Sequence, residues 1–165
     1  YSKLQDCWIG RMKKSGLYTV ERHEEDLALA NSWVLKAIEI IEYFNPKYWF
    51  IENPDNGKLK NMEFMQFLPY HTIDYCMYSD WGYRKRTRIW TNVPNFNPQV
   101  CNRNCGNLIT INERTFHFKN CGNSMSAKLI RDHCNANNFK KIGGCTSKLE
   151  RYRVPPNLVK SLMSF

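Results

Sequence analysis

The 165-residue sequence has no long hydrophobic run and no export signal. A membrane-crossing helix needs about 20 consecutive apolar residues, so we expect no membrane partner. The opening stretch YSKLQDCWIGRMKKSG lacks the continuous apolar segment of a secretion signal. The chain begins with Tyr rather than Met, and we interpret it as starting inside a longer product. These features favour an intracellular or virion location.

Acidic residues are scarce relative to basic ones. The sequence holds 24 Lys and Arg against 15 Asp and Glu, a net charge of +9. Such a surplus favours polyanionic partners, of which nucleic acid is the commonest, although a merely soluble basic protein remains the alternative. Hydrophobic residues make up 42% of the chain and aromatics 14%, which suffices for a core and excludes global disorder.

Helical and strand patterns alternate along the first half of the chain. Residues 24–44 place apolar side chains at helical spacing, which predicts a helix with a core-facing stripe. Within NPKYWFIENP at 45–54, the apolar run predicts a short buried strand that ends at Glu52, and 58–68 predict a second helix. Two more strands are predicted over 70–78 and 83–93, and the alternation indicates an α/β fold. The helical stripe comprises Leu27, Ala30, Val34, Ile38 and Ile41.

Charged side chains stand on two of these predicted strands. Glu52 is expected at the carboxyl end of the first strand, where ligands bind in open α/β sheets. The alternative is a glutamate at the edge of a loop, exposed to solvent. Arg86 and Arg88 share one face of the last strand because they are two residues apart. A guanidinium pair can hold a phosphate or a polarised carbonyl, although a solvated edge strand would also carry arginines.

Seven cysteines, an odd number, predict reduced thiols or metal ligands rather than a disulfide framework. Most lie between residues 94 and 145, where helical periodicity is lost and Asn, Gly and Lys dominate. The pattern Cys-x₃-Cys-x₁₁-His-x₃-Cys, which begins at Cys101, is typical of a small structural zinc site. Reduced cysteines scattered in a loop are the alternative. His133, Cys134 and Cys145 could substitute as ligands, whereas Cys76 fits a buried small hydrophobe. The predicted ligands are Cys101, Cys105, His117 and Cys121.

Four stretches occur in the order found in one enzyme family. They are ENP at 52–54, DYC at 74–76, RKRTRIW at 84–90 and VPPNLVKSL at 154–162, the last predicting a closing helix. Together they resemble the later motifs of the DNA cytosine-5 methyltransferases, above all the virus- and phage-encoded branch. Departures from the family pattern are Pro54 in place of valine, Arg84 in place of glutamine, and Tyr152 and Arg153 where Gly-Asn is expected.

The resemblance implies a partial Rossmann-like methyltransferase sheet with a loop-rich, Cys-rich insert. Residues 1–93 would form the C-terminal part of the catalytic domain, and 146–165 its closing helix. Residues 94–145 would form a target-recognition insert that carries the candidate zinc site. It further implies methyl transfer from S-adenosylmethionine to cytosine C5 of a flipped-out base in DNA. Glu52 would contact N3 and the exocyclic amine, while Arg86 and Arg88 would hold the base carbonyl and thiolate region.

Two family motifs are missing from the sequence. It has no Phe-x-Gly-x-Gly cofactor loop and no Pro-Cys dipeptide for the nucleophile, and Cys7 follows Asp. We therefore expect a fragment that is inactive alone and partnered by an N-terminal half of the same enzyme. The alternatives are a methyltransferase-derived DNA-binding protein without catalysis and an unrelated zinc-stabilised nucleic-acid binder. Cations available for phosphates are Arg103, Arg114, Lys119, Lys128, Arg131, Lys140 and Lys141.

Overall fold

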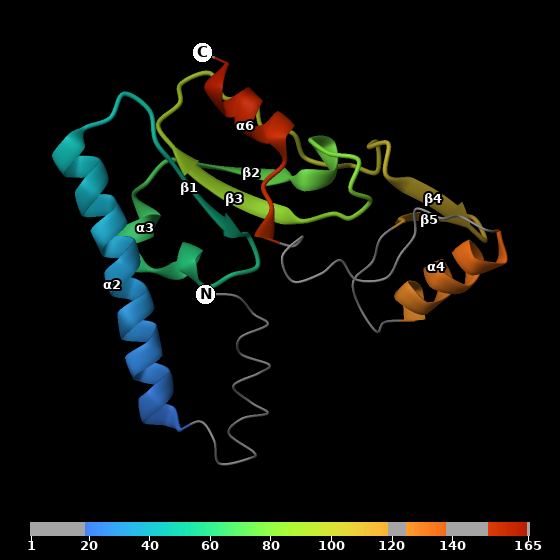
Figure 1. Cartoon of the computed structure of the whole chain (residues 1–165), viewed down its shortest axis with the longest axis horizontal. Helices are drawn as coiled ribbons and strands as arrows, with labels where there is room; N and C mark the ends of the chain where they lie inside the picture. Colours follow the sequence, from blue (N-terminus) through green and yellow to red (C-terminus); the bar gives the residue numbers. More distant parts are fainter. Residues whose placement is uncertain (1–18, 119–124, 138–151, 165) are drawn as a thin grey trace. The chain divides into compact units, whose positions relative to one another are not determined.

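A computed structural model of the chain describes residues 19–118, 125–137 and 152–164 (Figure 1). These residues form a mixture of helices and strands with small sheets, which confirms a mixed α and β structure. Labels with η denote short 3-10 helices. The elements are α2 (Val20–Phe44), β1 (Phe50–Pro54), η1 (Leu59–Asn61), α3 (Glu63–Gln66), β2 (Tyr70–Asp74), η2 (Tyr75–Met77), β3 (Arg86–Thr91), β4 (Leu108–Ile111), β5 (Arg114–His117), α4 (Met125–Ala136) and α6 (Pro156–Met163).

The strands form two small sheets. Strands β1, β3 and β2 make a three-stranded sheet in that order, so the last strand in the sequence lies between the other two (Figure 1). Strands β4 and β5 form an antiparallel hairpin in which Leu108 faces His117 and Ile111 faces Arg114. The turn between them uses left-handed backbone at Asn112 and Glu113, as a tight hairpin requires.

The chain divides into two compact units. The first unit contains Tyr1–His71 and Arg88–Val93, and the second contains Thr72–Thr87 and Pro94–Phe165. The three segments expected from the sequence, 1–93, 94–145 and 146–165, stay a prediction.

Helix α2 is the longest described element. It starts four residues before the predicted position, where the Thr19 side chain accepts a hydrogen bond from the Arg22 N–H at 3.2 Å. It ends at Asn45, whose left-handed backbone directs its N–H to the Ile41 carbonyl at 2.9 Å. The predicted stripe is half-buried rather than fully buried, and Val34 and Ile38 pack against the core of the first unit.

Strand β1 differs from its prediction in two ways. It is half-buried rather than buried, and it continues through Asn53 to Pro54 instead of ending at Glu52. The chain turns only afterwards, where the Gly57 N–H donates to the Pro54 carbonyl at 2.8 Å. Glu52 is therefore the middle residue of the strand, and the expectation that it occupies the strand end was wrong. A proline is tolerated there because it is the last residue of the strand.

Three further elements are shorter than predicted. The helix expected over 58–68 is broken into η1 and α3, whose Leu59 and Met65 enter a core with Trp90. Strand β2 stops at Asp74, and η2 follows it. Strand β3 begins only at Arg86.

In the region where the sequence shows no helical periodicity, the described residues include the helix α4, so the absence of periodicity did not exclude a helix there. Helix α4 packs on the β4–β5 hairpin through a small core of Ile111, Ile130 and Cys134. The closing helix α6 is confirmed, with Pro155 preceding its first residue and Leu158 and Leu162 buried. No helix in the described part of the chain is long and apolar enough to cross a membrane.

Candidate functional site

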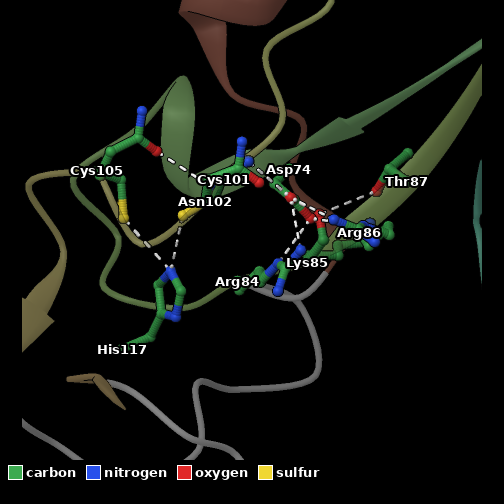
Figure 2. Close-up of polar contacts among 10 residues, drawn as sticks. Asp74, Arg84, Lys85, Arg86, Thr87, Cys101, Asn102, Cys105 and His117 are labelled. Atoms are coloured by element: carbon green, nitrogen blue, oxygen red, sulfur yellow. Dashed lines mark hydrogen bonds and ion pairs between the residues drawn. The ribbon is translucent and has the colours of Figure 1, made fainter. Parts of the chain in front are cut away.

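In the second unit, Arg84 and Arg86 converge on one buried carboxylate (Figure 2). The Asp74 side chain is fully buried, and both its oxygens are engaged. Arg84 donates to them from Nε and Nη2 at 3.0 Å each, and Arg86 at 3.2 and 3.1 Å. The backbone N–H of Cys101 adds a fifth bond at 2.9 Å. Arg84 and Arg86 keep 38% and 43% of their side chains exposed, so both guanidiniums can meet an anion from solvent.

The charge of Asp74 is set by these contacts. Burial of the carboxyl acts to raise its pKa, but the hydrogen bonds from Arg84, Arg86 and Cys101 outweigh burial. The pKa of Asp74 therefore lies below its ordinary value, and the carboxylate stays ionised at neutral pH. The same contact raises the pKa of Arg84.

In the first unit, Arg88 is held by a different acid. Its Nη2 lies 3.1 Å from Oδ1 of Asp55, and its side chain is only 16% exposed. The guanidinium also stacks over the Tyr70 ring, 3.9 Å from the ring centroid. Packing of this kind fixes the plane of the guanidinium, as recognition of a flat ligand requires.

The predicted catalytic residues therefore have different local surroundings. Arg86 pairs with Asp74 and Arg88 with Asp55, while Glu52 lies half-buried in the middle of β1. Sequence reasoning did not single out either acidic partner. The one available signal was that Asp74 begins the Asp-Tyr-Cys stretch within the strand predicted over 70–78.

A second group of side chains in the same unit brings three thiols and an imidazole together. Nε2 of His117 lies 3.5 Å from Sγ of Cys101 and 3.3 Å from Sγ of Cys105 (Figure 2). Cys76 completes the group, and the four candidate ligand atoms all lie within 4.8 Å of one another. Three of the four predicted metal ligands are thus adjacent, whereas Cys121 lies outside the described residues.

Cys76 is the member that the sequence did not indicate. It is buried, as expected of a small hydrophobe, but its sulfur belongs to the cluster. It comes from η2, His117 ends β5, and Cys101 and Cys105 lie in the connection that precedes β4. Cysteines far apart in the sequence cannot be grouped by spacing rules, so this ligand becomes visible only in the fold.

The pKa values of three groups in the cluster are shifted, and not all in the same direction. Burial lowers the pKa of His117, and the charge of Arg84 lowers it further, so the imidazole is neutral at pH 7. Burial acts to raise the pKa of Cys101, but hydrogen bonds from Cys105 and from the Arg103 backbone bring it below its ordinary value. Burial raises the pKa of Cys76. Neutral imidazole and thiolate are the forms that bind metals.

Asn107 holds the segment that carries Cys76. It is buried, its Oδ1 accepts a hydrogen bond from the Gly82 N–H at 2.9 Å, and its Nδ2 donates to the carbonyls of Cys76 and Ser79 at 2.9 and 2.8 Å. Gly82 has a φ of 84°, and a Cβ there would collide with the Phe118 ring. Both features keep the chain between η2 and β3 close to the start of β4.

Asn107→Ala is expected to lower the free energy of unfolding by about 2 kcal/mol, because it leaves buried backbone groups without hydrogen-bond partners. Urea-induced unfolding of the two proteins would measure the difference. Asn102→Ala, at an exposed asparagine five residues earlier, is the matched control and should stay within about 0.5 kcal/mol of the parent. Equal losses of unfolding free energy at Asn107 and Asn102 would contradict the stabilising role given to the Asn107 hydrogen bonds.

The second unit also contains a pocket of about 630 Å³, a volume typical of ligand sites. The predicted catalytic residues are not among those that line it. Its lining residues are Cys76, Met77, Tyr78, Ser79, Asp80, Trp81, Gly106, Asn107, Pro156 and Asn157.

Comparison with known proteins decides the family. A probable DNA (cytosine-5)-methyltransferase of Frog virus 3 (isolate Goorha) is 37% identical over 166 residues, covering 99% of this chain and 69% of the relative. The chain belongs to the DNA (cytosine-5)-methyltransferase family. It matches the C-terminal part of that relative. No protein-family profile and no solved structure matches the chain. The alternative of an unrelated zinc-stabilised binder is therefore wrong.

Proposed function

We propose that the chain contributes the base-binding side of an enzyme that transfers a methyl group to cytosine C5 in DNA. The observation that carries this proposal is the 37% identity to the Frog virus 3 relative, which extends over 99% of the chain. The family motifs add residue-level support, because Glu52, Arg86 and Arg88 occupy the motif positions named above. We infer further that β1, β3 and β2 belong to a larger Rossmann-like methyltransferase sheet.

In this proposal S-adenosylmethionine supplies the methyl group, and the chain's own residues bind and orient the base. Glu52 would address N3 and the exocyclic amine of cytosine, where a positioned acid can stabilise charge that develops on the ring. The fixed guanidinium of Arg88 and the partly exposed one of Arg86 would hold the base carbonyl and the thiolate region. The nucleophilic cysteine and the cofactor loop are absent from the 165 residues.

The hairpin and helix α4 fit the role of a target-recognition insert. They form one small packed body with a core of its own. Arg114 on β5 and Lys128 and Arg131 on α4 are exposed, as is Arg103 before the hairpin. Exposed cations on a compact body are suited to contacts with DNA phosphates, which position a reader on the duplex. Lys119, Lys140 and Lys141 lie outside the described residues.

DNA binding is expected to weaken steeply with salt, because each phosphate contact releases counterions. Titration of a fluorescent duplex at several salt concentrations measures the slope of log affinity against log salt. Replacing both Lys128 and Arg131 with glutamine should reduce that slope by about 2. The matched control replaces Arg22 and Lys36 on α2, which should leave the slope unchanged. Affinity that hardly varies with salt would contradict DNA binding.

A catalytically inactive, methyltransferase-derived DNA-binding protein is the second candidate. The observation that favours it is the lack of both the Pro-Cys dipeptide and the glycine-rich loop in the sequence. Transfer of a labelled methyl group to cytosine distinguishes the two. Residues 1–165 alone should show no transfer, whereas the same chain supplied with a segment that carries the two missing motifs should be active. Continued inactivity of that combination, with DNA binding intact, would establish the second candidate.

A further inference from the structure

The donor atoms of the Cys/His cluster have the spacing of a tetrahedral metal site. Zinc bonds of about 2.3 Å to sulfur and about 2.0 Å to nitrogen place neighbouring sulfur and nitrogen ligands about 3.5 Å apart. The His117 Nε2 distances to the two sulfurs of Cys101 and Cys105 are 3.5 and 3.3 Å. All four donor atoms, including Sγ of Cys76, lie within 4.8 Å of one another. Binding of zinc therefore requires only small adjustments.

We propose that Cys76, Cys101, Cys105 and His117 bind one structural zinc ion. Three cysteines and one histidine are a common closed ligand set for structural zinc, with no position left for a substrate. The proposal stands independently of methyl transfer, because a structural ion is needed whether or not the chain is catalytic. It also replaces Cys121, which the sequence spacing indicated, with Cys76.

The surroundings of the cluster favour a metal over unbound thiols. All three cysteines are free thiols, and a neutral imidazole lies between two of them. Three thiolates around a divalent ion would leave one net negative charge on the site. Backbone N–H groups of Arg103 and Asn104 donate to the Cys101 sulfur. Hydrogen bonds of this kind support and orient metal-binding ligands.

Zinc would join three segments of the second unit that are separated in the sequence. The ligands come from η2, from the connection before β4 and from the end of β5. The small core of the hairpin and α4 contains none of them. Cys101 also donates its backbone N–H to Asp74, so a metal ligand is directly linked to the carboxylate that binds Arg84 and Arg86. Metal binding in such a segment supplies folding free energy.

Metal content and cobalt substitution test the proposal on the unaltered chain. Protein purified without chelators should contain one zinc per chain by elemental analysis. Replacement by Co²⁺ should give the visible bands of a tetrahedral site and a charge-transfer band of the intensity expected for three thiolates. Zinc well below one per chain, together with no Co²⁺ spectrum on titration, would overturn the proposal.

Cysteine variants identify the ligands. Cys76→Ala should weaken Co²⁺ binding on the order of a hundredfold, since even outer-shell changes cost about tenfold to a hundredfold. Cys121→Ala and Cys134→Ala should bind as the parent does; Cys134 is the matched control because it is buried but lies in the small core of α4. Loss of binding in Cys121→Ala with retention in Cys76→Ala would overturn the assignment.

Alkylation of the unaltered chain decides the matter if Cys76→Ala does not fold. The zinc-loaded protein is treated with iodoacetamide with and without a chelator, and modified cysteines are located by mass spectrometry. Chelation should expose Cys76, Cys101 and Cys105 together, while Cys121 should react equally in both samples. Protection of Cys121 by zinc, with Cys76 unaffected by the chelator, would contradict the proposed ligand set.

Discussion

Glu52→Gln is expected to lower the rate of methyl transfer by about a hundredfold or more, while DNA affinity changes little. The substitution keeps the size and shape of the side chain but replaces an acid with an amide that cannot exchange a proton. Interactions that strengthen only as charge develops on the cytosine ring would be lost, whereas phosphate contacts would remain. Single-turnover methyl transfer by the chain supplied with the missing motifs measures the rate, and a duplex titration measures the affinity.

Glu63→Gln provides the matched control. Glu63 is an exposed acid at the start of α3, in the same unit as Glu52, and its replacement removes the same charge. Its rate should equal that of the parent. An unchanged rate in Glu52→Gln would show that Glu52 does not act in the base-binding site. A parallel loss of rate and DNA affinity would show that its role is structural instead.

Helix α2 could be predicted because its pattern and its end signals agree. Apolar residues recur at helical spacing from Leu27 to Ile41, which is about four turns, and Asn45 before Pro46 follows the last helical residue. The segment over 58–68 lacks this agreement, because its apolar residues surround the helix axis rather than form one stripe. Tertiary packing of Leu59 and Met65 then decides its shape, as expected where local helix propensity is weak.

The position of Glu52 was misjudged for a different reason. Asn53 and Pro54 are residues typical of the end of a strand, yet a strand accepts proline as its last residue. Sequence patterns identify which residue types terminate elements, but the hydrogen bonds that continue or end a strand depend on its neighbours. In β1 the neighbour is β3, which comes more than 30 residues later in the sequence.

The candidate metal site could likewise be predicted only in part, because one ligand comes from a distant part of the sequence. Cys101, Cys105 and His117 lie within 17 residues of the chain, and their spacing indicated a site. Cys76 stands outside that interval, within a segment predicted to be a strand. Only the short η2 helix after β2 directs its sulfur to the others. The acidic partners Asp55 and Asp74 were likewise missed, because an arginine pair in a sequence carries no information about which carboxylate it meets.

Arg84 and Arg86 are expected to stabilise the chain jointly through Asp74. Either Arg84→Met or Arg86→Met should cost only about 1 kcal/mol of unfolding free energy, because the other guanidinium still neutralises the carboxylate and each side chain is partly exposed. The double variant should cost about 3 to 5 kcal/mol, since among the described residues the fully buried charge would keep the Cys101 N–H as its one hydrogen-bond partner. The double loss thus exceeds the sum of the single losses.

Adding Asp74→Asn to the double variant distinguishes a buried charge from lost packing. The neutral amide needs no cationic partner and still presents an oxygen to the Cys101 N–H, so the triple variant should recover most of the stability lost in the double. Urea unfolding with unchanged m-values measures the two single variants, the double and the triple variant against the parent. Arg114 is an exposed arginine of the same unit, and the control Arg114→Met should stay within about 0.5 kcal/mol of the parent. Strictly additive single effects, or a triple variant no more stable than the double, would show that Arg84 and Arg86 stabilise the fold through their aliphatic packing and not through the charge of Asp74.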